Sequence, residues 1–322
     1  MSVLVYTENW DGQFKKLSFE LVSFACKLAE MTNTSATALS IGNVEKNELS
    51  KLGKYGINKI LNCPGDQYKV LDNQVFTSII EQAARKEEAQ IIILSHNNAG
   101  KALAPRVSAK LKAGIVTAVS AIPASIEPLT VLKKVYSGKA FAKITIKTNI
   151  KILTLAQNSF ELIEKDSDAG IEEFNADISN DFFKTKVKNV EKQKGKIILT
   201  DAEIVVSGGR GMKSPDNWSP IEELAELLGG ATACSRPVAD EGWRPHEEHT
   251  GQTGKIIAPN LYIAAGISGA IQHLAGISSS KNIVAINTDK EAPVFEAADY
   301  GIIGDAMKVL PELIKIIKEM KS

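Results

Sequence analysis

The sequence predicts an α/β protein of two domains, each built around a parallel sheet. Short, wholly apolar runs such as Ile91–Leu94 alternate with longer amphipathic segments, which is typical of parallel strands covered by helices on both faces. At 322 residues the chain is long enough for two cores of this kind. A polar, charge-rich stretch, residues 164–196, separates the two sets of elements and is the natural linker. We therefore expect domains at residues 1–190 and 196–322.

The elements of the first domain follow from two patterns. Buried strands are short apolar runs, and amphipathic helices place apolar residues three or four positions apart. These patterns predict strands at Val3–Tyr6, Ser35–Ile41, Lys59–Asn62 and Ile91–Leu94, and helices at Phe19–Glu30, Lys46–Tyr55, Asn73–Lys86 and Asn98–Lys112. Residues 114–163 differ, because β-branched alternation in Val131–Val135 and Ala142–Thr148 predicts antiparallel strands.

The second domain repeats the alternation of strands and helices after a strand-sized apolar hint at Ile197–Leu199. Strands are predicted at Glu203–Val206, Ala231–Cys234, Leu261–Ala265 and Ile283–Asn287, and helices at Pro220–Leu228, Ser268–Ile277, Asp305–Lys308 and Pro311–Met320. Ser268 suits the N-cap of its helix, and Pro311 is acceptable in the first turn of the last helix.

The composition excludes several classes of function. Lys and Arg together number 38, as do Asp and Glu, so there is no net charge to attract nucleic acid or an acidic membrane surface. The three cysteines are far apart and show neither a disulfide framework nor metal-ligand spacing, which indicates a reducing compartment. The N-terminus enters a strand without a basic flank or cleavage site, and no apolar run approaches the roughly 18–20 residues that span a bilayer. We expect a cytoplasmic protein without membrane insertion.

The glycine–serine turn within residues 266–273 is the most informative feature. It joins the apolar run Leu261–Ala265 directly to a helix, whose unpaired N–H groups and positive dipole end point beyond the turn. Gly266 and Gly269 allow the backbone to approach a ligand closely, and His273 lies about one helical turn further on. The turn therefore predicts an anion or dinucleotide site, although a strand–turn–helix junction also favours glycine and serine for structural reasons alone.

Further polar residues follow the other strands of the second domain. Arg210 lies among three glycines directly after a strand, where it either binds a pyrophosphate or is a surface arginine in a flexible loop. Ser235 and Arg236 end the next strand, so they project from the same edge of the sheet. Asn287 ends a third strand. Asp305 opens a helix, either as an N-cap or as a partner for ribose or ribityl hydroxyls.

Two histidine-containing loops allow more than one interpretation. Ser95–Gly100 follows a strand and precedes a helix, where a mononucleotide would bind, but a structural loop is favoured over a ligand role for His96. His246–His249 lacks the H-E-x-x-H spacing that places two imidazoles on one helical face, and Pro245 favours an extended loop. A metal site is therefore disfavoured, and no G-x-S-x-G motif supports a hydrolase.

Five motifs occur in order along the second half of the chain. They are VSGGRG at 206–211, ACSRP at 233–237, GWRPH at 242–246, GQTGK at 251–255 and the long run from Ala258 to Asp305. With these motifs the chain resembles the electron transfer flavoprotein alpha subunit family, densely over residues 200–311 and more loosely across the first half. The resemblance implies an N-terminal Rossmann-like, nucleotide-binding-type domain that contacts a partner subunit, and a C-terminal α/β domain that binds FAD. The chain departs from the family pattern at Glu248-His249-Thr250, Thr288 and Lys290.

The resemblance carries the FAD site over residue by residue. Arg210 and the turn Ser268–His273 would hold the pyrophosphate and the flavin edge, and Thr253 would hydrogen-bond near N5. Arg236 would lie against the isoalloxazine, and His273 would face its N1–C2=O edge. The implied FAD contacts are Arg210, Ser235, Arg236, Thr250, Gly251, Gln252, Thr253, Ser268, Gly269, Ala270, Ile271, Gln272, His273, Asn287, Asp305 and Ala306, with Asn287 and Asp305 toward the adenosine half. The resemblance implies no catalytic residue and no metal.

The function that the resemblance implies is electron transport without substrate turnover. One FAD per alpha subunit would be reduced by flavin dehydrogenases and reoxidised by an acceptor such as a quinone oxidoreductase. The partner would be a homologous beta subunit carrying AMP, and the polar linker around Glu191–Gly195 would let the FAD domain swivel. One alternative is a stand-alone flavin- or nicotinamide-dependent dehydrogenase, which would need an acid/base pair that the sequence does not show. A nucleotide-binding structural module, supported by the first domain alone, is the other.

Overall fold

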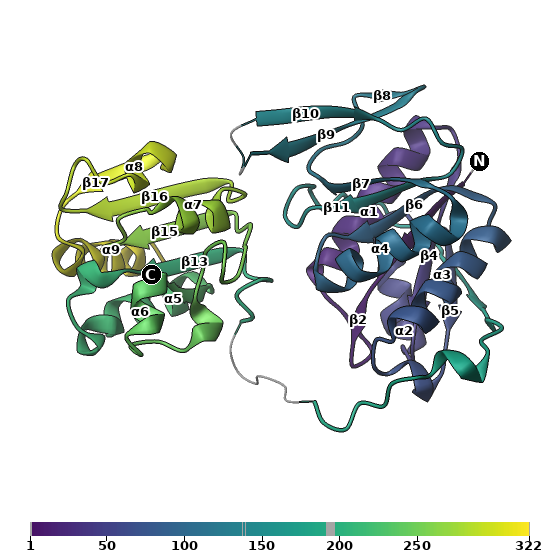
Figure 1. The fold of residues 1–322 in the computed structure, drawn as a ribbon, viewed down its shortest axis with the longest axis horizontal. Coiled ribbons are helices and arrows are strands. Elements are labelled where there is room, and N and C mark those ends of the chain that lie inside the picture. The colour runs from purple at the N-terminus through teal and green to yellow at the C-terminus, as the bar shows by residue number, and fades with distance from the viewer. Residues whose placement is uncertain (1, 137, 139, 191–196, 322) are drawn as a thin grey trace. The chain divides into compact units, whose positions relative to one another are not determined.

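The computed structural model of the protein describes residues 2–136, 138, 140–190 and 197–321. The chain divides into two compact units, Met1–Val190 and Glu191–Ser322 (Figure 1). The expected linker segment Glu191–Gly195 lies outside the described residues. The mixed α/β class predicted from the sequence is confirmed, with one parallel-rich sheet and one wholly parallel sheet. Within the described ranges, no helix is long and apolar enough to cross a membrane.

The first unit is built on a ten-stranded sheet in the order β10-β9-β7-β11-β6-β1-β4-β5-β12, with β8 paired to β9. Its parallel strands are β1 (Ser2–Tyr6), β4 (Ser35–Ile41), β5 (Lys59–Cys63), β6 (Ala89–Ser95), β7 (Gly114–Val119), β11 (Lys151–Leu155) and β12 (Gly170–Glu173). The antiparallel strands predicted at Val131–Val135 and Ala142–Thr148 are confirmed as the pair β9 (Leu129–Val135) and β10 (Ala140–Thr145), and the short β8 (Ser125–Ile126) also pairs with β9. A small separate hairpin joins β2 (Asn9–Trp10) to β3 (Gln13–Phe14).

Helices cover both faces of this sheet. Helix α1 (Lys16–Met31) and the short α2 (Lys46–Ser50) pack into one apolar core. Helices α3 (Asn73–Lys86) and α4 (Asn98–Leu111) pack into a second core on the other face. The predicted helix Lys46–Tyr55 is wrong in its second half, because a 3₁₀ segment, Lys51–Lys54, replaces the α-helix there. Two further 3₁₀ turns cover Asp66–Tyr68 and Asn180–Phe182.

Strand β12 lies within the stretch that the sequence predicts as linker, so that prediction is wrong for residues 170–173. This strand pairs in parallel with β5 and extends the first sheet by one edge strand. The two glutamates of β12 break the apolar pattern by which a buried strand is recognised in the sequence. Ile171 is nevertheless partly buried against the first core, and Phe174 is buried in the second. Two apolar side chains are therefore enough to hold β12 against the sheet, provided that its glutamates form ion pairs.

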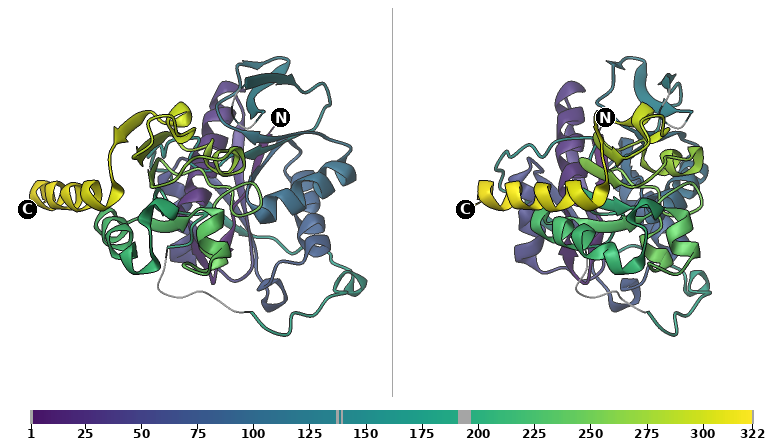
Figure 2. Two further views of the ribbon diagram at one scale, coloured as in Figure 1. Left: turned by 60° about the vertical axis from the view of Figure 1, so that its left-hand side comes forward. Right: turned by 90° about the vertical axis from the view of Figure 1, so that its left-hand side faces the viewer.

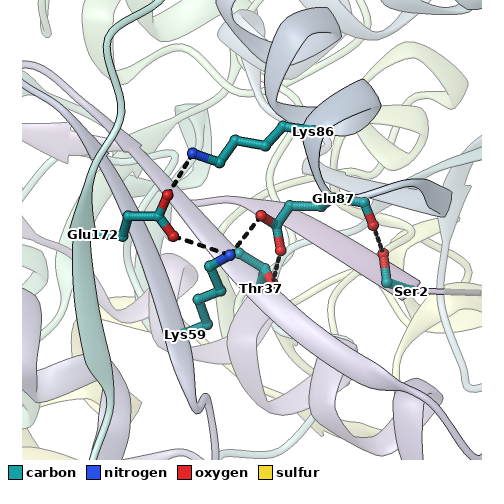
Figure 3. A network of polar contacts seen from close by, with 6 residues as sticks. All are labelled: Ser2, Thr37, Lys59, Lys86, Glu87 and Glu172. Atoms are coloured by element: carbon teal, nitrogen blue, oxygen red, sulfur yellow. Dashed lines mark hydrogen bonds and ion pairs between the residues drawn. The ribbon is translucent and has the colours of Figure 1, made fainter.

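A network of charged side chains supplies those partners near the start of the parallel strands (Figure 3). Lys59 on β5 bridges Glu87 at 2.8 Å and Glu172 of β12 at 3.0 Å, and Lys86 contacts Glu172 from the end of α3. Thr37 of β4 donates to the other carboxylate oxygen of Glu87 at 2.9 Å. The Glu87 hydrogen bond is the main cause that raises the pKa of Lys59. The network ties the edge strand β12 to the sheet and to α3.

The second unit contains a five-stranded parallel sheet in the order β14-β13-β15-β16-β17. Its strands are β13 (Ile204–Gly208), β14 (Ala231–Cys234), β15 (Leu261–Ala265), β16 (Asn282–Asn287) and β17 (Tyr300–Ile303). Helices α5 (Ser219–Leu228), α6 (Arg236–Asp240) and α9 (Ala306–Lys321) share one apolar core, while α7 (Ile271–Ile277) and α8 (Val294–Ala297) lie against the other. Figure 2 shows the yellow helix α9 running beside α5. The 3₁₀ turns are Arg210–Met212, Pro215–Trp218 and His246–Glu248.

Three predictions for this unit are wrong in detail. The hint at Ile197–Leu199 forms no strand, although Leu199 is buried in the core. Helix α7 begins at Ile271 with Ala270 as N-cap, because Gly269 has φ +84° and holds the chain out of the helix. Ser268 is therefore not the cap. Pro311 lies inside one continuous helix, α9, where its missing N–H removes a single backbone hydrogen bond.

Candidate functional site

A cavity of about 440 Å³ opens at the carboxyl edge of the second sheet. The strands β13, β14, β15 and β16 run in parallel, so the loops that follow them meet at this edge. Arg210 follows β13, Arg236 follows β14, the turn 266–270 follows β15, and Asn287 ends β16. The turn 249–253 and the first residues of α7 complete the wall. The fold therefore gathers polar residues from four loops into one concave site.

Most of the predicted contact residues line this cavity. They are Arg210, Ser235, Arg236, Thr250, Gly251, Gln252, Thr253, Ser268, Gly269, Ala270, Gln272, His273 and Asn287. The structure does not bring Ile271, Asp305 and Ala306 into the same wall. Ile271 is 80% exposed, and Ala306 is buried in the core beneath α9.

Asp305 has other contacts in this structure. Its carboxylate lies 2.8 Å from Nζ of Lys213 and accepts the backbone N–H of Met307 at 3.0 Å. The hydrogen bond with Lys213 is the main cause that lowers the pKa of Asp305. These contacts match the N-cap interpretation of Asp305. A role toward the adenosine half of FAD stays a prediction.

The cavity wall includes residues that the sequence prediction left out. They are Gly211, Pro237, His249 and Ile267, and the wall also includes Gly266, which the sequence indicated as a point of close approach. His249 lies in the loop that was weighed as a metal site, and its neighbour Thr250 was already a predicted contact. Within the described part of the chain, no group of three or more His, Cys, Asp or Glu side chains could hold a metal. Burial is the main cause that lowers the pKa of His249, and its ring packs under the turn that carries Thr253.

The floor of the cavity is backbone without side chains. Gly266 has φ +63°, and a Cβ built on it would lie 2.8 Å from Cα of Gly211. The loops after β13 and β15 thus touch backbone to backbone, joined by a hydrogen bond from Gly211 N to Gly266 O at 3.0 Å. Such a bare surface lets a ligand approach peptide groups directly.

Two arginines supply positive charge at the cavity rim. Arg210 lies 3.9 Å from Glu241, and Arg236 lies 3.3 Å from Asp240. Both arginine side chains are more than half exposed, at 66% and 61%, so their carboxylate pairs are weak. An anionic ligand can therefore recruit either guanidinium at little cost.

His273 forms the inner wall of the cavity. Its Nε2 lies 2.9 Å from the Tyr262 hydroxyl in the core. Its Nδ1 forms no hydrogen bond of normal geometry with any described residue, although the Thr250 backbone lies close. Burial lowers the pKa of His273 to about 4, so the imidazole is neutral at pH 7. His273 therefore brings no charge of its own to the cavity wall.

The turn 249–254 is held by backbone and by a buried ion pair. Thr250 N donates to Cys234 O at 3.0 Å, and Gln252 N donates to Gln272 O at 2.7 Å. Before the turn, Arg244 forms two hydrogen bonds with Glu248, at 2.7 and 2.8 Å, and lies over the Trp218 ring. The Glu248 hydrogen bond is the main cause that raises the pKa of Arg244. This pair fixes the segment that delivers Thr250 to the wall.

Arg244→Ala should lower the free energy of unfolding of this unit by about 2–3 kcal/mol, because it leaves Glu248 buried without its cation. The Arg244 side chain is only 15% exposed and that of Glu248 only 10%. Lys318→Ala is the matched control, since Lys318 forms a 2.7 Å pair with Glu223 on the surface and should cost less than about 1 kcal/mol. Urea denaturation measures both, and equal losses would show that the Arg244 pair does not hold the turn.

His96, which follows strand β6 in the first unit, already contacts neighbouring side chains of the chain. His96 Nδ1 lies 2.8 Å from Thr154 Oγ1, and burial lowers the pKa of His96 to about 4. The Glu8 carboxylate accepts a hydrogen bond from Asn97 Nδ2 at 2.9 Å at the start of α4. An anion is thus already present where a phosphate would bind, which favours the structural interpretation of this loop.

Comparison with known proteins gives matches in both units. The family model "Electron transfer flavoprotein domain" matches residues 3–179, and "Electron transfer flavoprotein FAD-binding domain" matches residues 198–278. An electron transfer flavoprotein subunit alpha from Bacillus subtilis is 33% identical over 99% of this chain and 98% of its own length. One from Syntrophomonas wolfei is 35% identical over 98% of both chains, and Protein FixB of Clostridium saccharobutylicum is 34% identical over 99% and 97%.

These matches extend over nearly the whole chain and over both structural units. None of them favours the dehydrogenase alternative. The protein belongs to the electron transfer flavoprotein alpha subunit family.

Proposed function

We propose that this alpha subunit binds one FAD in the cavity at the carboxyl edge of its second sheet. The observation that carries the proposal is the convergence of four strand-end loops, two weakly paired arginines and a bare glycine floor on one site. A volume of about 440 Å³ is in the usual range for cofactor pockets. Backbone groups without side chains suit a pyrophosphate, and the neutral, partly apolar inner wall suits a flavin ring.

Each wall would contact a different part of the cofactor. Arg210 and the turn 266–270 would hold the pyrophosphate, and Asn287, whose side chain donates to Ile267 O at 2.9 Å, would fix that turn. Thr253 would hydrogen-bond near N5 of the ring. Arg236 would lie beside the ring, and His273 would face its N1–C2=O edge. These assignments rest on the shared cavity wall together with the family resemblance.

Bound FAD would supply both two-electron and one-electron redox chemistry. The residues of this chain would set the energy of that chemistry. Arg236 places a permanent positive charge at the rim of the cavity, beside the buried wall around His273. Negative charge added to the ring would therefore be stabilised more than the uncharged state, which favours uptake of electrons.

The proposed partner is a beta subunit that carries AMP and completes the heterodimer. Flavin dehydrogenases would be the electron donors, and a quinone oxidoreductase or a similar protein would be the acceptor. The strand end of the first unit at His96 holds the chain's own carboxylate, which is consistent with a nucleotide bound in the partner rather than here. The cytoplasmic location and the swivelling of the FAD domain stay predictions from the sequence.

Flavin content and turnover test the proposed function together. The heterodimer, produced with its beta subunit and incubated with FAD, should be yellow and retain one FAD per alpha chain after desalting. It should show no oxidase or NADH-dependent turnover in the absence of donor and acceptor proteins. A folded heterodimer that stays colourless would contradict the proposal. Steady turnover of a small substrate by the yellow protein would favour the stand-alone dehydrogenase.

A further inference from the structure

A second cavity of the second unit, about 690 Å³ in volume, lies beside strand β14. Strand β14 pairs on one side with β13 and stands at the end of its five-stranded sheet, so its other side is an edge. The wall of the cavity follows this edge over Gly229–Thr232, and Ile197, Leu199 and Pro245 lie in the same wall. We call this cavity the β14 groove. It shares no lining residue with the cavity proposed for FAD.

The backbone of Thr232 faces the β14 groove. In a parallel strand, the N–H and C=O groups of every second residue point to the same neighbour. Ser235 N donates to Gly208 O of β13 at 3.1 Å, whereas Cys234 O accepts Thr250 N at 3.0 Å on the opposite side. Thr232 is two residues before Cys234, so its N–H and C=O also point away from β13. Within the described residues neither group has a hydrogen-bond partner.

The same strand edge already accepts additional backbone at its C-terminal end. His249 forms a parallel bridge with Cys234, next to the hydrogen bond from Thr250. The pairing stops there, because the preceding residues His246–Glu248 form a 3₁₀ turn. The edge at Thr232 is therefore left without a strand. An unpaired edge beside a groove is the geometry in which an extended peptide adds a strand, bound by main-chain hydrogen bonds.

The lining of the β14 groove is acidic and partly apolar. Its charged residues are one lysine and four glutamates, namely Lys255, Glu222, Glu226, Glu247 and Glu248. Arg244 pairs with Glu222 and Glu248. Glu226 and Glu247 form no ion pair with any residue that the structure describes. Ile197 is 49% exposed and adds an apolar surface. A complementary occupant carries positive charge and apolar side chains on an extended backbone.

We propose that the β14 groove binds an extended, lysine- or arginine-rich segment of another polypeptide, which adds a strand beside Thr232. The N–H and C=O of Thr232 form main-chain hydrogen bonds with this segment, and its basic side chains lie against Glu226 and Glu247. Its apolar side chains cover Ile197. A second copy of the chain is disfavoured as the occupant, because pairing of two β14 edges brings the same glutamates together. The proposal does not depend on FAD.

A synthetic peptide of alternating lysine and valine, capped at both ends, is the probe. We expect it to bind the heterodimer in a one-to-one ratio, measured by fluorescence anisotropy, and to slow hydrogen exchange of the Thr232 amide. A capped peptide of alternating glutamate and valine should bind at least about tenfold more weakly. Equal binding of the two peptides would overturn the proposal. So would a Thr232 amide that is already protected before the peptide is added.

Thr232→Pro tests the main-chain contact. Proline removes the N–H that points away from β13, so the pairing of β14 with β13 is retained. The lysine–valine peptide should bind this variant about tenfold more weakly. Thr232→Val is the matched control, since it keeps the N–H and removes only the hydroxyl, and it should bind the peptide like wild type. Equal affinity of both variants would overturn strand addition at Thr232.

A double variant, Glu226→Gln with Glu247→Gln, tests the charge of the groove. It should weaken binding of the lysine–valine peptide by about three- to tenfold at low salt, and by less at high salt. Glu223→Gln is the control, because Glu223 lies on the same helix α5 outside the groove and pairs with Lys318. An unchanged affinity of the double variant would overturn the acidic recognition, even if Thr232→Pro does not fold. Self-association of the wild-type protein that Thr232→Pro abolishes, without peptide binding, would identify a second copy as the occupant instead.

Discussion

Gly269→Ala should strongly weaken FAD binding and destabilise the second unit. Gly269 has φ +84°, and a Cβ there would lie 2.4 Å from N and 2.5 Å from Cα of Val294. The contact is with backbone that is itself held by a hydrogen bond from Val294 N to Ser268 O at 3.0 Å, so the clash cannot be relieved by a rotamer change. Left-handed strain and overpacking together cost about 2–5 kcal/mol. Because about 1.4 kcal/mol is tenfold in affinity, FAD binding should weaken at least about a hundredfold.

Gly242→Ala separates strain from steric clash. Gly242 has φ +72°, but a Cβ there would have no atom of the described residues within 4 Å. Its cost should therefore be only the conformational term of about 1–2 kcal/mol, with FAD affinity close to wild type. Chemical denaturation and FAD titration of both variants are the measurements. Equal effects of the two substitutions would mean that the turn after β15 does not shape the cavity.

Arg236→Ala should shift the flavin potential to more negative values. The guanidinium lies at the cavity rim and is only weakly engaged by Asp240 at 3.3 Å. A charged contact of about 1–3 kcal/mol that acts mainly on the reduced ring corresponds to a shift on the order of 40–130 mV in the first one-electron step. Spectroelectrochemistry of the FAD-loaded heterodimer measures this shift.

Arg210→Ala is the matched control, because it removes the same positive charge from the same cavity. Arg210 is equally exposed at the same cavity and has a similarly weak carboxylate partner, Glu241. If it faces the pyrophosphate, its loss should weaken oxidised and reduced FAD alike and leave the potential nearly unchanged. If Arg236→Ala has the same potential as wild type, or if both variants shift the potential equally, Arg236 does not lie beside the ring.

The strands of both sheets could be predicted because they are short apolar runs between helices. Ala231–Cys234 and Leu261–Ala265 have the predicted bounds, as does the helix Asn73–Lys86, whose cap Asp72 accepts hydrogen bonds from Gln74 and Val75. Local signals were sufficient at these positions. The edge strand β12 could not be predicted, because its glutamates are compensated by Lys59 and Lys86 from distant parts of the chain.

The start of α7 and the course of α9 depended on tertiary structure as well. The backbone at Gly269 is set by its contact with Val294, which lies 25 residues further along the sequence and leaves no local pattern. Pro311 is tolerated inside α9 because residues on both sides of it in the sequence pack into the core. Ala306 and Leu310 precede it, and Ile314 follows it. Propensity alone favours a break there.

The candidate site was largely predictable from its position at strand ends. Parallel strands bring the residues after each strand to one edge, which is why Arg210, Arg236 and Asn287 meet although they are far apart in sequence. The inward position of His249 and the hydrogen bond between Tyr262 and His273 could not be predicted. Tyr262 reads as an apolar strand residue, and the loop around His249 has no periodicity to show that its ring turns inward.

The most direct test of FAD binding in this cavity is an experimentally determined structure of the FAD-loaded heterodimer. We expect the isoalloxazine ring in the cavity of the second unit, in contact with Arg236, Thr253 and His273, and the pyrophosphate against Arg210 and the turn 266–270. An FAD bound anywhere else, for example at the strand end beside His96 in the first unit, would contradict the assignment.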